Sequence, residues 1–348
     1  MSQTRPPSAA APLKVIQVGI GNMGDVWLQT VRQSANVVFS GFVEVNSAIA
    51  EQQAARYDLD RSTIFDSLDK ALANVEAEAI IDVAPPQFRK PIALTAFAKG
   101  LPVLAEKPLG ESYADALAIA EQSAATGLLH LTAQNYRYNA QVQTMKQILD
   151  SGVLGAIGFI TVDYYKGPRF GGFRAEMRYP LIVDMAIHHF DMMRYLIGKE
   201  PQSVYGRSWR PAWGWNRGED SAALSFAFAG GVIVSYTGSW ASEVKTTPWN
   251  GNWRIECERG VLSLEDDTVF IAMRPTGEGQ EGQPASERKE IPLLVLPYSG
   301  QGYLLQEFYG AIRHGSAAIT TCHDNVRSLA MVFQTIASFE TGLPVTFS

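Results

Sequence analysis

The segment IVDMAIHHFD, residues 182–191, holds two adjacent histidines in a chain that has only five, and two aspartates flank them. Residues four apart lie on one face of an α-helix, so we expect Asp184 and His188 to lie one above the other. Histidine suits proton transfer because its ordinary pKa is close to neutral pH. Asp184 would hold the imidazole in one tautomer or bind a substrate hydroxyl.

The same helical spacing separates the two histidines. Asp191 and Tyr195 continue the stripe of Asp184 and His188, whereas His189 is turned away by about 100°. We expect the narrow polar stripe to face an internal cleft and His189 to be a packing residue. The alternative, in which His188 is a hydrogen-bonded polar group of the core, stays open.

A glycine-rich loop, GIGNMG at residues 19–24, directly follows a predicted strand and opens a predicted helix. In this context GxGxxG predicts a dinucleotide site, because the three glycines permit a tight turn, approach of a pyrophosphate and close helix–strand packing. The helix N-terminus offers N–H groups to the phosphates. The expected cofactor contacts in the loop are Gly19, Gly21, Asn22, Met23 and Gly24.

Glu44 follows the second predicted strand, residues 37–43. A carboxylate at this position can accept hydrogen bonds from the ribose hydroxyls and repels a 2′-phosphate. Neither Val45 nor Asn46 supplies a positive charge to balance such a phosphate. NAD is therefore favoured over NADP. The alternative is a glycine-rich turn beside a surface glutamate.

Glu106, Lys107 and Pro108 follow the predicted strand 101–105. Open α/β sheets bind ligands at the carboxyl ends of their strands. A partly desolvated lysine there suits proton transfer or polarisation of a substrate oxygen. Taken alone, the motif is also compatible with a surface lysine beside a turn proline.

Apolar runs predict the scaffold that positions these residues. Up to about residue 133, short strands alternate with helices, which predicts an α/β fold with an N-terminal Rossmann domain, a doubly wound parallel sheet. The expected strands are residues 13–18, 37–43, 79–83, 101–105 and 128–132, and the expected helices are 47–57, 87–99 and 112–126.

After about residue 133, strands follow one another at short spacing, with a long helix expected over 180–197. This pattern of strands and helices predicts a C-terminal α+β domain with a large open, mostly antiparallel sheet. The sheet is expected to include a hairpin around Gly230-Gly231. The expected organisation is a disordered leader, residues 1–12, a dinucleotide-binding Rossmann domain, 13–133, and a substrate-binding and oligomerisation domain, 134–348.

The glycine loop, the EKP motif and the D-x-x-x-H helix, in this order, resemble the glucose–fructose oxidoreductase / inositol dehydrogenase / rhizopine-catabolism family (Gfo/Idh/MocA) over essentially the whole chain. The resemblance implies an NAD(P)-dependent oxidoreductase that transfers a hydride between nicotinamide and a secondary alcohol or ketone of a sugar, inositol or related polyol. The family's catalytic lysine is carried over onto Lys107 and its helix motif onto Asp184 and His188.

The chain departs from the family pattern in three places, one of which is MRYP, residues 177–180, where a glycine run commonly precedes the helix. Ala186 replaces a usual glycine, and Arg89 stands where the family's T-P-x-x-x-H segment has a histidine, which leaves the nicotinamide pocket and the sugar preference open. Further cofactor candidates are Pro85, Glu106 and Lys107, and the substrate-binding candidates are Lys107, Arg137, Lys166, Asp184 and His188. No metal site is expected.

The composition and charge of the chain limit the kinds of partner that it is expected to bind. A net charge of −6 without a block of like charge argues against a nucleic-acid surface, and no stretch reads as a signal peptide or membrane helix. Two cysteines do not make a disulfide framework, so a cytoplasmic protein is expected. The exposed face of an open sheet commonly packs on another subunit, which predicts a homodimer or homotetramer.

Two other functions are kept as alternatives. One is glycoside cleavage through transient oxidation by a tightly held NAD, without net redox change. The other is a non-catalytic, ligand-sensing regulator on the same fold. The joint presence of Lys107, Asp184 and His188 ranks the regulator last. Whether Lys107 or His188 accepts the substrate proton stays open.

Overall fold

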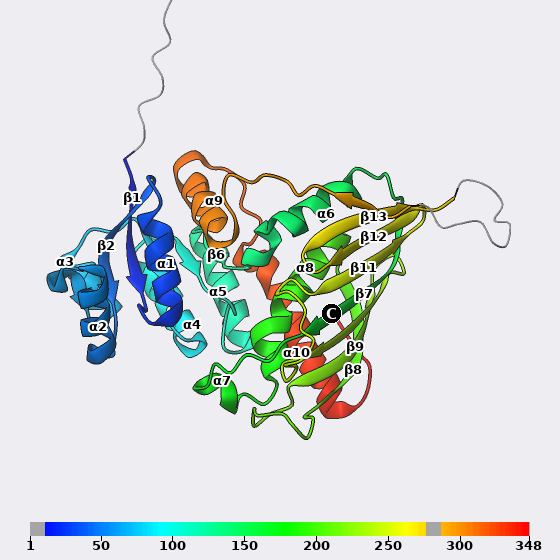
Figure 1. Cartoon of the computed structure of the whole chain (residues 1–348). Coiled ribbons are helices and arrows are strands. Elements are labelled where there is room, and N and C mark those ends of the chain that lie inside the picture. Colours follow the sequence, from blue (N-terminus) through cyan, green and yellow to red (C-terminus); the bar gives the residue numbers. More distant parts are fainter. Residues whose placement is uncertain (1–10, 276–286, 348) are drawn as a thin grey trace, which may run out of the picture. The chain divides into compact units, whose positions relative to one another are not determined.

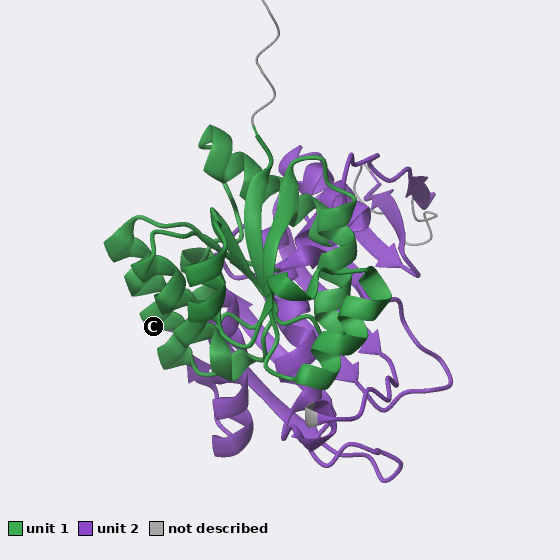
Figure 2. Ribbon diagram, turned by 90° about the vertical axis from the view of Figure 1, so that its left-hand side faces the viewer, with its two compact units in different colours: residues 1–133, 301–326 green, residues 134–300, 327–348 purple. Residues whose placement is uncertain are grey.

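The computed structural model describes residues 11–275 and 287–347, which form two compact units. Of these residues, unit 1 holds 11–133 and 301–326, and unit 2 holds 134–275, 287–300 and 327–347 (Figures 1 and 2). Residues 1–10 of the expected leader lie outside the described residues.

Unit 1 contains a six-stranded sheet with the order β3-β2-β1-β4-β5-β6, and all its strand pairs are parallel. The strand order reverses between β1 and β4, and the crevice at the carboxyl ends of such strands is where doubly wound sheets bind dinucleotides. This topology confirms the predicted Rossmann fold. The strands are β1 (Leu13–Val18), β2 (Val37–Val43), β3 (Ile64–Phe65), β4 (Ala79–Asp82), β5 (Val103–Ala105) and β6 (His130–Thr132).

Helices cover both faces of this sheet (Figure 2). Side-chain caps set several of their starts: Asn46 accepts N–H bonds at the start of α2, and Ser112 does so at the start of α5, which ends at Gly127 in the left-handed conformation. The helices are α1 (Asn22–Arg32), α2 (Ser47–Tyr57), α3 (Leu68–Asn74), α4 (Arg89–Ala98) and α5 (Tyr113–Thr126), with short 3₁₀ turns η1 (Arg61–Thr63) and η2 (Pro86–Phe88).

The chain returns to unit 1 after the second sheet. Residues 301–326, which include most of α9 (Gly300–His314), pack with the Rossmann sheet, and the Thr132 N–H donates to the Thr320 carbonyl at 2.8 Å. Arg313 also forms an ion pair with Glu78 at 2.7 Å. The sequence assigned these residues to the C-terminal domain, whereas the structure includes them in unit 1.

Unit 2 is built on a nine-stranded sheet with the order β14-β13-β12-β11-β7-β10-β9-β8-β15. Neighbouring strands are antiparallel except β7 and β10, which confirms the predicted, mostly antiparallel sheet. The hairpin of β9 and β10 turns at Gly230 and Gly231, both at positive φ. The strands are β7 (Ile157–Tyr165), β8 (Pro201–Trp209), β9 (Ser221–Phe228), β10 (Ile233–Ser239), β11 (Asn252–Cys257), β12 (Gly260–Glu265), β13 (Thr268–Met273), β14 (Lys289–Ile291) and β15 (Val345–Thr346).

The core of unit 2 lies between α8 and the sheet. Phe190 of α8 packs on Phe226 of β9 and Tyr236 of β10, with ring centroids 5.0 and 5.8 Å apart. Alternate side chains of these strands point inward and are buried. The helices of this unit are η3 (Asn135–Tyr138), α6 (Ala140–Asp150), α7 (Phe173–Glu176), η4 (Leu181–Ala186) and α8 (Ile187–Ile197), and α10 (Cys322–Thr341) enters it from unit 1.

The helix that carries the two histidines is not a uniform α-helix. Leu181–Ala186 form a π-helix, and the α-helix begins only at Ile187 and ends before Gly198, which is in the left-handed conformation. In a π-helix the hydrogen bonds run from i to i+5, so the α-helical spacing expected for Asp184 does not hold there. The predicted single α-helix over 180–197 is corrected accordingly.

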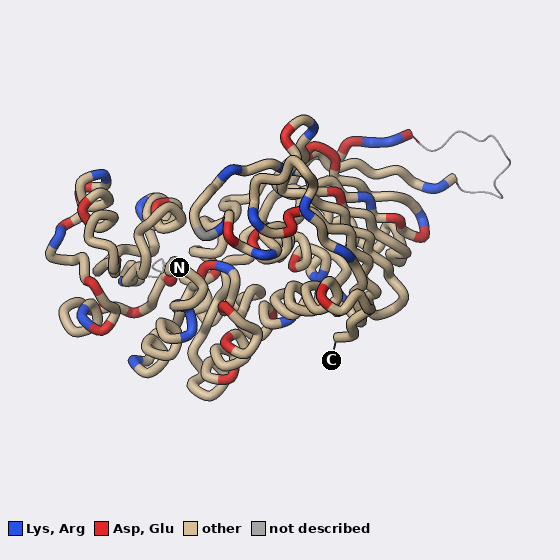
Figure 3. Tube along the Cα trace, turned by 90° about the horizontal axis from the view of Figure 1, so that it is seen from below, with Lys and Arg blue, Asp and Glu red and all other residues tan. Residues whose placement is uncertain are grey.

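Charged residues of both signs are interspersed along the chain (Figure 3). Cys257 and Cys322 are buried and form no disulfide. Within residues 11–275 and 287–347, no helix has the length and apolar character that crossing a membrane requires.

Candidate active site

The three glycines of the loop lie in three different environments, as their spacing predicts. Gly19 has a φ of +87°, and a Cβ there would lie 3.0 Å from the Ala84 nitrogen. A Cβ on Gly24 would lie 2.6 Å from the Gly19 carbonyl oxygen. Gly21, at the N-cap of α1, has no neighbouring atom within 4 Å of such a Cβ and no side-chain cap. The loop is therefore closed at its ends and open at Gly21, where a phosphate could approach the helix N-terminus.

Gln17 holds this loop from inside, which the sequence did not reveal. Its side-chain amide nitrogen donates to the carbonyls of Gly19 and Gly24 at 3.0 and 2.9 Å. The residue is fully buried in β1. The one signal in the sequence was a polar residue inside an otherwise apolar strand.

Glu44 lies beside the loop at the carboxyl end of β2. Its carboxylate accepts hydrogen bonds from the backbone N–H of Ile20 at 3.2 Å and of Asn46 at 3.0 Å. No Lys or Arg in the described part of the chain forms an ion pair with it. The carboxylate is thus fixed at the position expected for a ribose contact. Asn22 and Pro85 are exposed, and Met23 is half-buried.

Glu106 and Lys107 follow β5, as expected. The Glu106 carboxylate is buried and accepts hydrogen bonds from the indole N–H of Trp27 at 2.9 Å and from the Lys107 backbone N–H at 3.2 Å. The Lys107–Pro108 peptide bond is cis, and Lys107 is half-buried. The backbone of the lysine is therefore anchored through Glu106 to α1.

Arg89 has a structural role that the sequence did not reveal. Its guanidinium lies 3.4 Å from the Asp82 carboxylate and donates to the Asp82 carbonyl at 3.2 Å and to the Lys107 carbonyl at 3.4 Å. Both charged residues are buried; burial raises the pKa of Asp82, and Arg89 opposes this rise. Arg89 therefore connects the ends of β4 and β5 directly beside Lys107.

His188 is buried and stacks on Tyr136 of η3, with ring centroids 4.3 Å apart and an interplanar angle of 16°. Asp184 accepts a hydrogen bond at 2.6 Å from the guanidinium of Arg174, on α7. Neither Tyr136 nor Arg174 was expected at this site. Tyr136 was missed because it lies far from His188 in the sequence, whereas Arg174 is only 10 residues before Asp184 but lies on a separate short helix.

His189 is a core residue, as the helical spacing indicated. It is fully buried, and Nε2 donates to the Trp249 carbonyl at 3.1 Å, so Nδ1 of the neutral ring accepts from the Tyr236 hydroxyl at 3.2 Å. Desolvation lowers its pKa to about 4. His189 is consequently neutral at physiological pH.

Asp191 does not face a cleft, contrary to the expectation. Its carboxylate accepts two hydrogen bonds from the Arg137 guanidinium, at 2.6 and 2.7 Å, and one from the Ser328 hydroxyl at 2.6 Å. All three residues are buried. Of the expected stripe, Asp191 therefore belongs to a buried ion pair, and Arg137 lies in the core of unit 2.

Family models match both units. Residues 13–133 match the oxidoreductase family with an NAD-binding Rossmann fold, and residues 142–263 match the GFO/IDH/MocA C-terminal domain. An inositol 2-dehydrogenase of Streptomyces avermitilis is 31% identical over 275 residues, which is 77% of each protein. The chain belongs to the GFO/IDH/MocA oxidoreductase family.

Two further similarities extend over nearly the whole chain. An uncharacterized protein of Sinorhizobium fredii is 25% identical over 341 residues, or 95% of each protein. The structure of an Agrobacterium radiobacter oxidoreductase, in complex with NAD+, L-tartaric acid and magnesium, has a TM-score of 0.86 at 17% identity and covers 97% of this chain and 98% of its own. The latter shows the shared fold. Together with the family models, these findings confirm an NAD-binding oxidoreductase.

In unit 2 of this GFO/IDH/MocA protein, cationic side chains also lie over aromatic rings. The Lys166 ammonium lies 4.9 Å from the ring centroid of Trp249, whose carbonyl is bonded to His189. Arg169 covers the ring of Trp215 at 4.1 Å. Trp213, by contrast, is 72% exposed. Trp249 therefore connects Lys166, an expected substrate contact, to His189.

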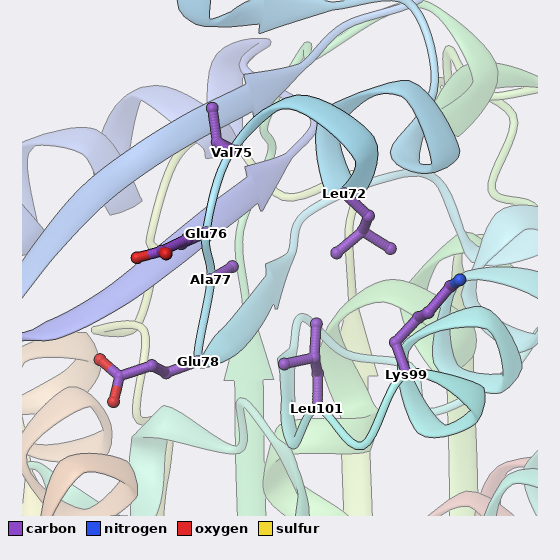
Figure 4. Close-up of a pocket in the computed structure, with 7 residues that line it drawn as sticks. All are labelled: Leu72, Val75, Glu76, Ala77, Glu78, Lys99 and Leu101. Carbon is purple, nitrogen blue, oxygen red and sulfur yellow. The ribbon is translucent and has the colours of Figure 1, made fainter.

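A hollow of about 480 Å³ lies elsewhere in unit 1. It is lined by the end of α3, the connection to β4 and the turn before β5 (Figure 4). These residues lie at the amino ends of the strands, the opposite edge from the glycine loop. In the portion of the chain that the structure describes, no group of three or more His, Cys, Asp and Glu residues could hold a metal ion.

Proposed function

We propose that this protein is an NAD-dependent dehydrogenase that oxidises a secondary alcohol of inositol, a sugar or a related polyol, or reduces the corresponding ketone. The observation that carries the proposal is the presence of Lys107, Asp184 and His188 in a chain whose glycine loop is open at Gly21. Similarity to an inositol 2-dehydrogenase supports the substrate class.

The residues present fit NAD. The open N-terminus of α1 suits a pyrophosphate, and the fixed carboxylate of Glu44 suits two ribose hydroxyls. Bound NAD would supply the hydride acceptor for alcohol oxidation. The residues proposed to hold it are Gly19, Gly21, Asn22, Met23, Gly24, Glu44, Pro85, Glu106 and Lys107.

In the proposed reaction, the Lys107 ammonium donates a hydrogen bond to the substrate oxygen and stabilises the negative charge that develops there. The hydroxyl proton passes to neutral His188 while Lys107 stays an ammonium, or it passes to Lys107 when that side chain starts as a neutral amine and becomes the ammonium that holds the developing alkoxide. Asp184, neutralised in part by Arg174, binds a neighbouring substrate hydroxyl, and Lys166 is a further substrate contact.

The proposal is tested with a panel of polyols and sugars that includes myo-inositol, with NAD and NADP, by following the absorbance of reduced nicotinamide. Lys107→Met and His188→Asn should each lower kcat by about 10²–10⁴-fold, the contribution of a general acid or base. Exposed residues of the same types, Lys99→Met and His314→Asn, serve as controls. If no polyol or keto-sugar is turned over, the proposal is wrong, and glycoside cleavage without net NADH formation would support the redox-neutral alternative.

The pH dependence of kcat in His188→Asn also identifies the proton acceptor. If His188 is the base, His188→Asn should abolish the acidic limb of the kcat profile, because that limb reports protonation of the base in the enzyme–substrate complex. If Lys107 is the base, the limb should persist in His188→Asn at lower amplitude.

We also propose that the protein is a cytoplasmic homo-oligomer that associates through the open face of the nine-stranded sheet. Phe159 and Ile233 are directly paired on this face and are each 44% exposed. Their neighbours on β9 and β10, Ala227 and Ser235, are small and uncharged. Ile233→Lys should reduce the mass measured by light scattering, whereas Val153→Lys, at an exposed site outside the strands, should not. An unchanged mass in Ile233→Lys would contradict this interface.

A further inference from the structure

His188 has an aromatic partner that fixes the plane of its ring. Tyr136 stacks on the imidazole nearly face to face, at 4.3 Å and 16°, and His188 is only 6% exposed. The second torsion of a histidine side chain has a broad, roughly two-fold preference, so a ring without such a partner can rotate. The stacked phenol therefore restricts the direction in which the imidazole nitrogens point.

The neighbouring residues on both elements lock this pair in place. Arg137 follows Tyr136 on η3, and Asp191 is three residues after His188 on α8. Their two hydrogen bonds, at 2.6 and 2.7 Å, form a bidentate fork in which both residues are buried. A bidentate pair fixes orientation as well as distance. It thereby sets the position of η3 against α8 at the point where the two rings meet.

Further contacts hold the Arg137 end of this fork. The Gln143 side chain donates to the Arg137 carbonyl at 2.6 Å and to the Tyr195 hydroxyl at 3.0 Å. The Arg137 guanidinium also lies 5.3 Å from the Tyr195 ring centroid. Tyr195, the last residue of the expected stripe, thus belongs to the support of this fork.

We propose that Tyr136 is a positioning residue that orients the His188 imidazole for proton transfer, and that the Arg137–Asp191 fork holds Tyr136 in place. This inference rests on the role proposed above for His188. It gives Arg137 a task different from the direct substrate contact expected from the sequence. The ring of Tyr136, and not its hydroxyl, is the group that matters.

The stack also supports the charged form of the base. Burial, with a contribution from Asp184, raises the pKa of Tyr136, so its phenol stays neutral. The face of a neutral aromatic ring attracts a cation. An imidazolium formed when His188 accepts the substrate proton is therefore stabilised by the same ring that orients it.

The first test needs no substrate. In protein labelled with ¹³C-histidine, the His188 ring signal is identified by its loss in His188→Asn. Ring stacking should place this signal upfield, and Tyr136→Phe should keep it there. Tyr136→Leu should remove the upfield shift, and Asp191→Asn, which weakens the fork but leaves both rings, should shift the signal in the same direction. An unchanged His188 signal in Tyr136→Leu would overturn the proposal, even if no polyol is turned over.

The second test separates positioning from a general loss of structure. Tyr136→Leu should lower kcat by about 10-fold to 100-fold, the effect of misplacing a catalytic group by roughly 1 Å. The KM values for substrate and NAD should change by less than about three-fold, since uniform binding is retained. Tyr136→Phe should restore kcat, and Tyr298→Leu, the same change at an exposed site, should leave it unchanged. If Tyr136→Phe is as damaging as Tyr136→Leu, the hydroxyl is the essential group and the proposal fails.

Discussion

Arg89 and Asp82 form an ion pair that is almost completely buried at the carboxyl ends of the Rossmann strands, with 3.4 Å between guanidinium and carboxylate. Removal of one partner from such a pair leaves an uncompensated charge. Arg89→Met should therefore lower the free energy of unfolding by about 3–5 kcal/mol, measured by urea titration. Asp82→Asn combined with Arg89→Met should recover part of this loss.

The loss of unfolding free energy caused by Arg89→Met should also depend on pH. Burial raises the pKa of Asp82 from its ordinary value of 3.8, and Arg89 opposes the rise, so its removal raises the folded-state pKa further. The folded state then keeps a proton that the unfolded state has already released, and stability falls as pH rises above 3.8. The difference from the unsubstituted protein should be smaller at about pH 5 than at about pH 7. A difference that grows on acidification would contradict this assignment.

Replacement of Gly21 by alanine should impair NAD binding, whereas replacement of Gly24 by alanine should impair stability. Gly21→Ala should fold with nearly unchanged stability, because its Cβ meets no atom within 4 Å, but it should weaken NAD binding at least about 10-fold by obstructing the pyrophosphate. Gly24→Ala should lower the melting temperature, because its Cβ would lie 2.6 Å from the Gly19 carbonyl oxygen. Calorimetric titration with NAD measures the affinity of each variant, and thermal unfolding measures its stability. If both variants lost the same affinity and had the same melting temperature, the separate roles of Gly21 and Gly24 would be contradicted.

Glu44 should control the choice between NAD and NADP. Glu44→Gln keeps one of the two side-chain oxygens that accept from the Ile20 and Asn46 N–H groups, and it removes the charge that repels a 2′-phosphate. The ratio of the two dissociation constants should move toward NADP by about 10-fold, or roughly 1.4 kcal/mol. Glu51→Gln, at an exposed position on α2, is the matched control. An unchanged ratio in Glu44→Gln would remove Glu44 from the cofactor site.

His189 should make the protein less stable in acid. Its folded-state pKa, about 4, is below the ordinary value of 6.5, so the unfolded state takes up a proton first as pH falls below 6.5. Stability is therefore lost between about pH 6.5 and pH 4, by about 1–2 kcal/mol over the first pH unit and a half. In urea titrations, His189→Gln should lose less unfolding free energy between pH 6.5 and pH 4 than the unsubstituted protein does. A variant that loses as much stability as the original protein would show that His189 is already protonated in the fold.

Much of the fold could be predicted because local patterns determine it. β1, β2 and α2 begin and end at the bounds predicted from the apolar runs and the helix-like segment 47–57. β3 and β15 have two residues each and are too short to show an alternation. The periodicity of α9 indicates a buried face but does not say which sheet covers it, so the return of residues 301–326 to unit 1 was not foreseen.

The site was predictable only where one segment supplies its own geometry. The roles of Gly19, Gly21 and Gly24 follow from their spacing, since each acts on the backbone of the same loop. Trp27 and Glu106, by contrast, meet across a separation of 79 residues. Tyr136 was likewise missed because the fold brings it to His188. Arg89 and Arg174 were missed although Asp82 and Asp184 are only 7 and 10 residues away, because the irregular segments between them show no periodicity.

The π-helix at Leu181–Ala186 means that the spacing of Asp184 and His188 depends on helix pitch as well as on residue order. An i to i+5 turn accommodates one residue more than an α-turn. Deletion of one residue between them would turn Asp184 by about 100° around the helix relative to His188. Two chains with the same D-x-x-x-H letters but a different helix pitch would thus place the aspartate at different angles around the helix. On the substrate role proposed for Asp184, a single-codon insertion or deletion in this helix would alter substrate preference without replacing any polar residue.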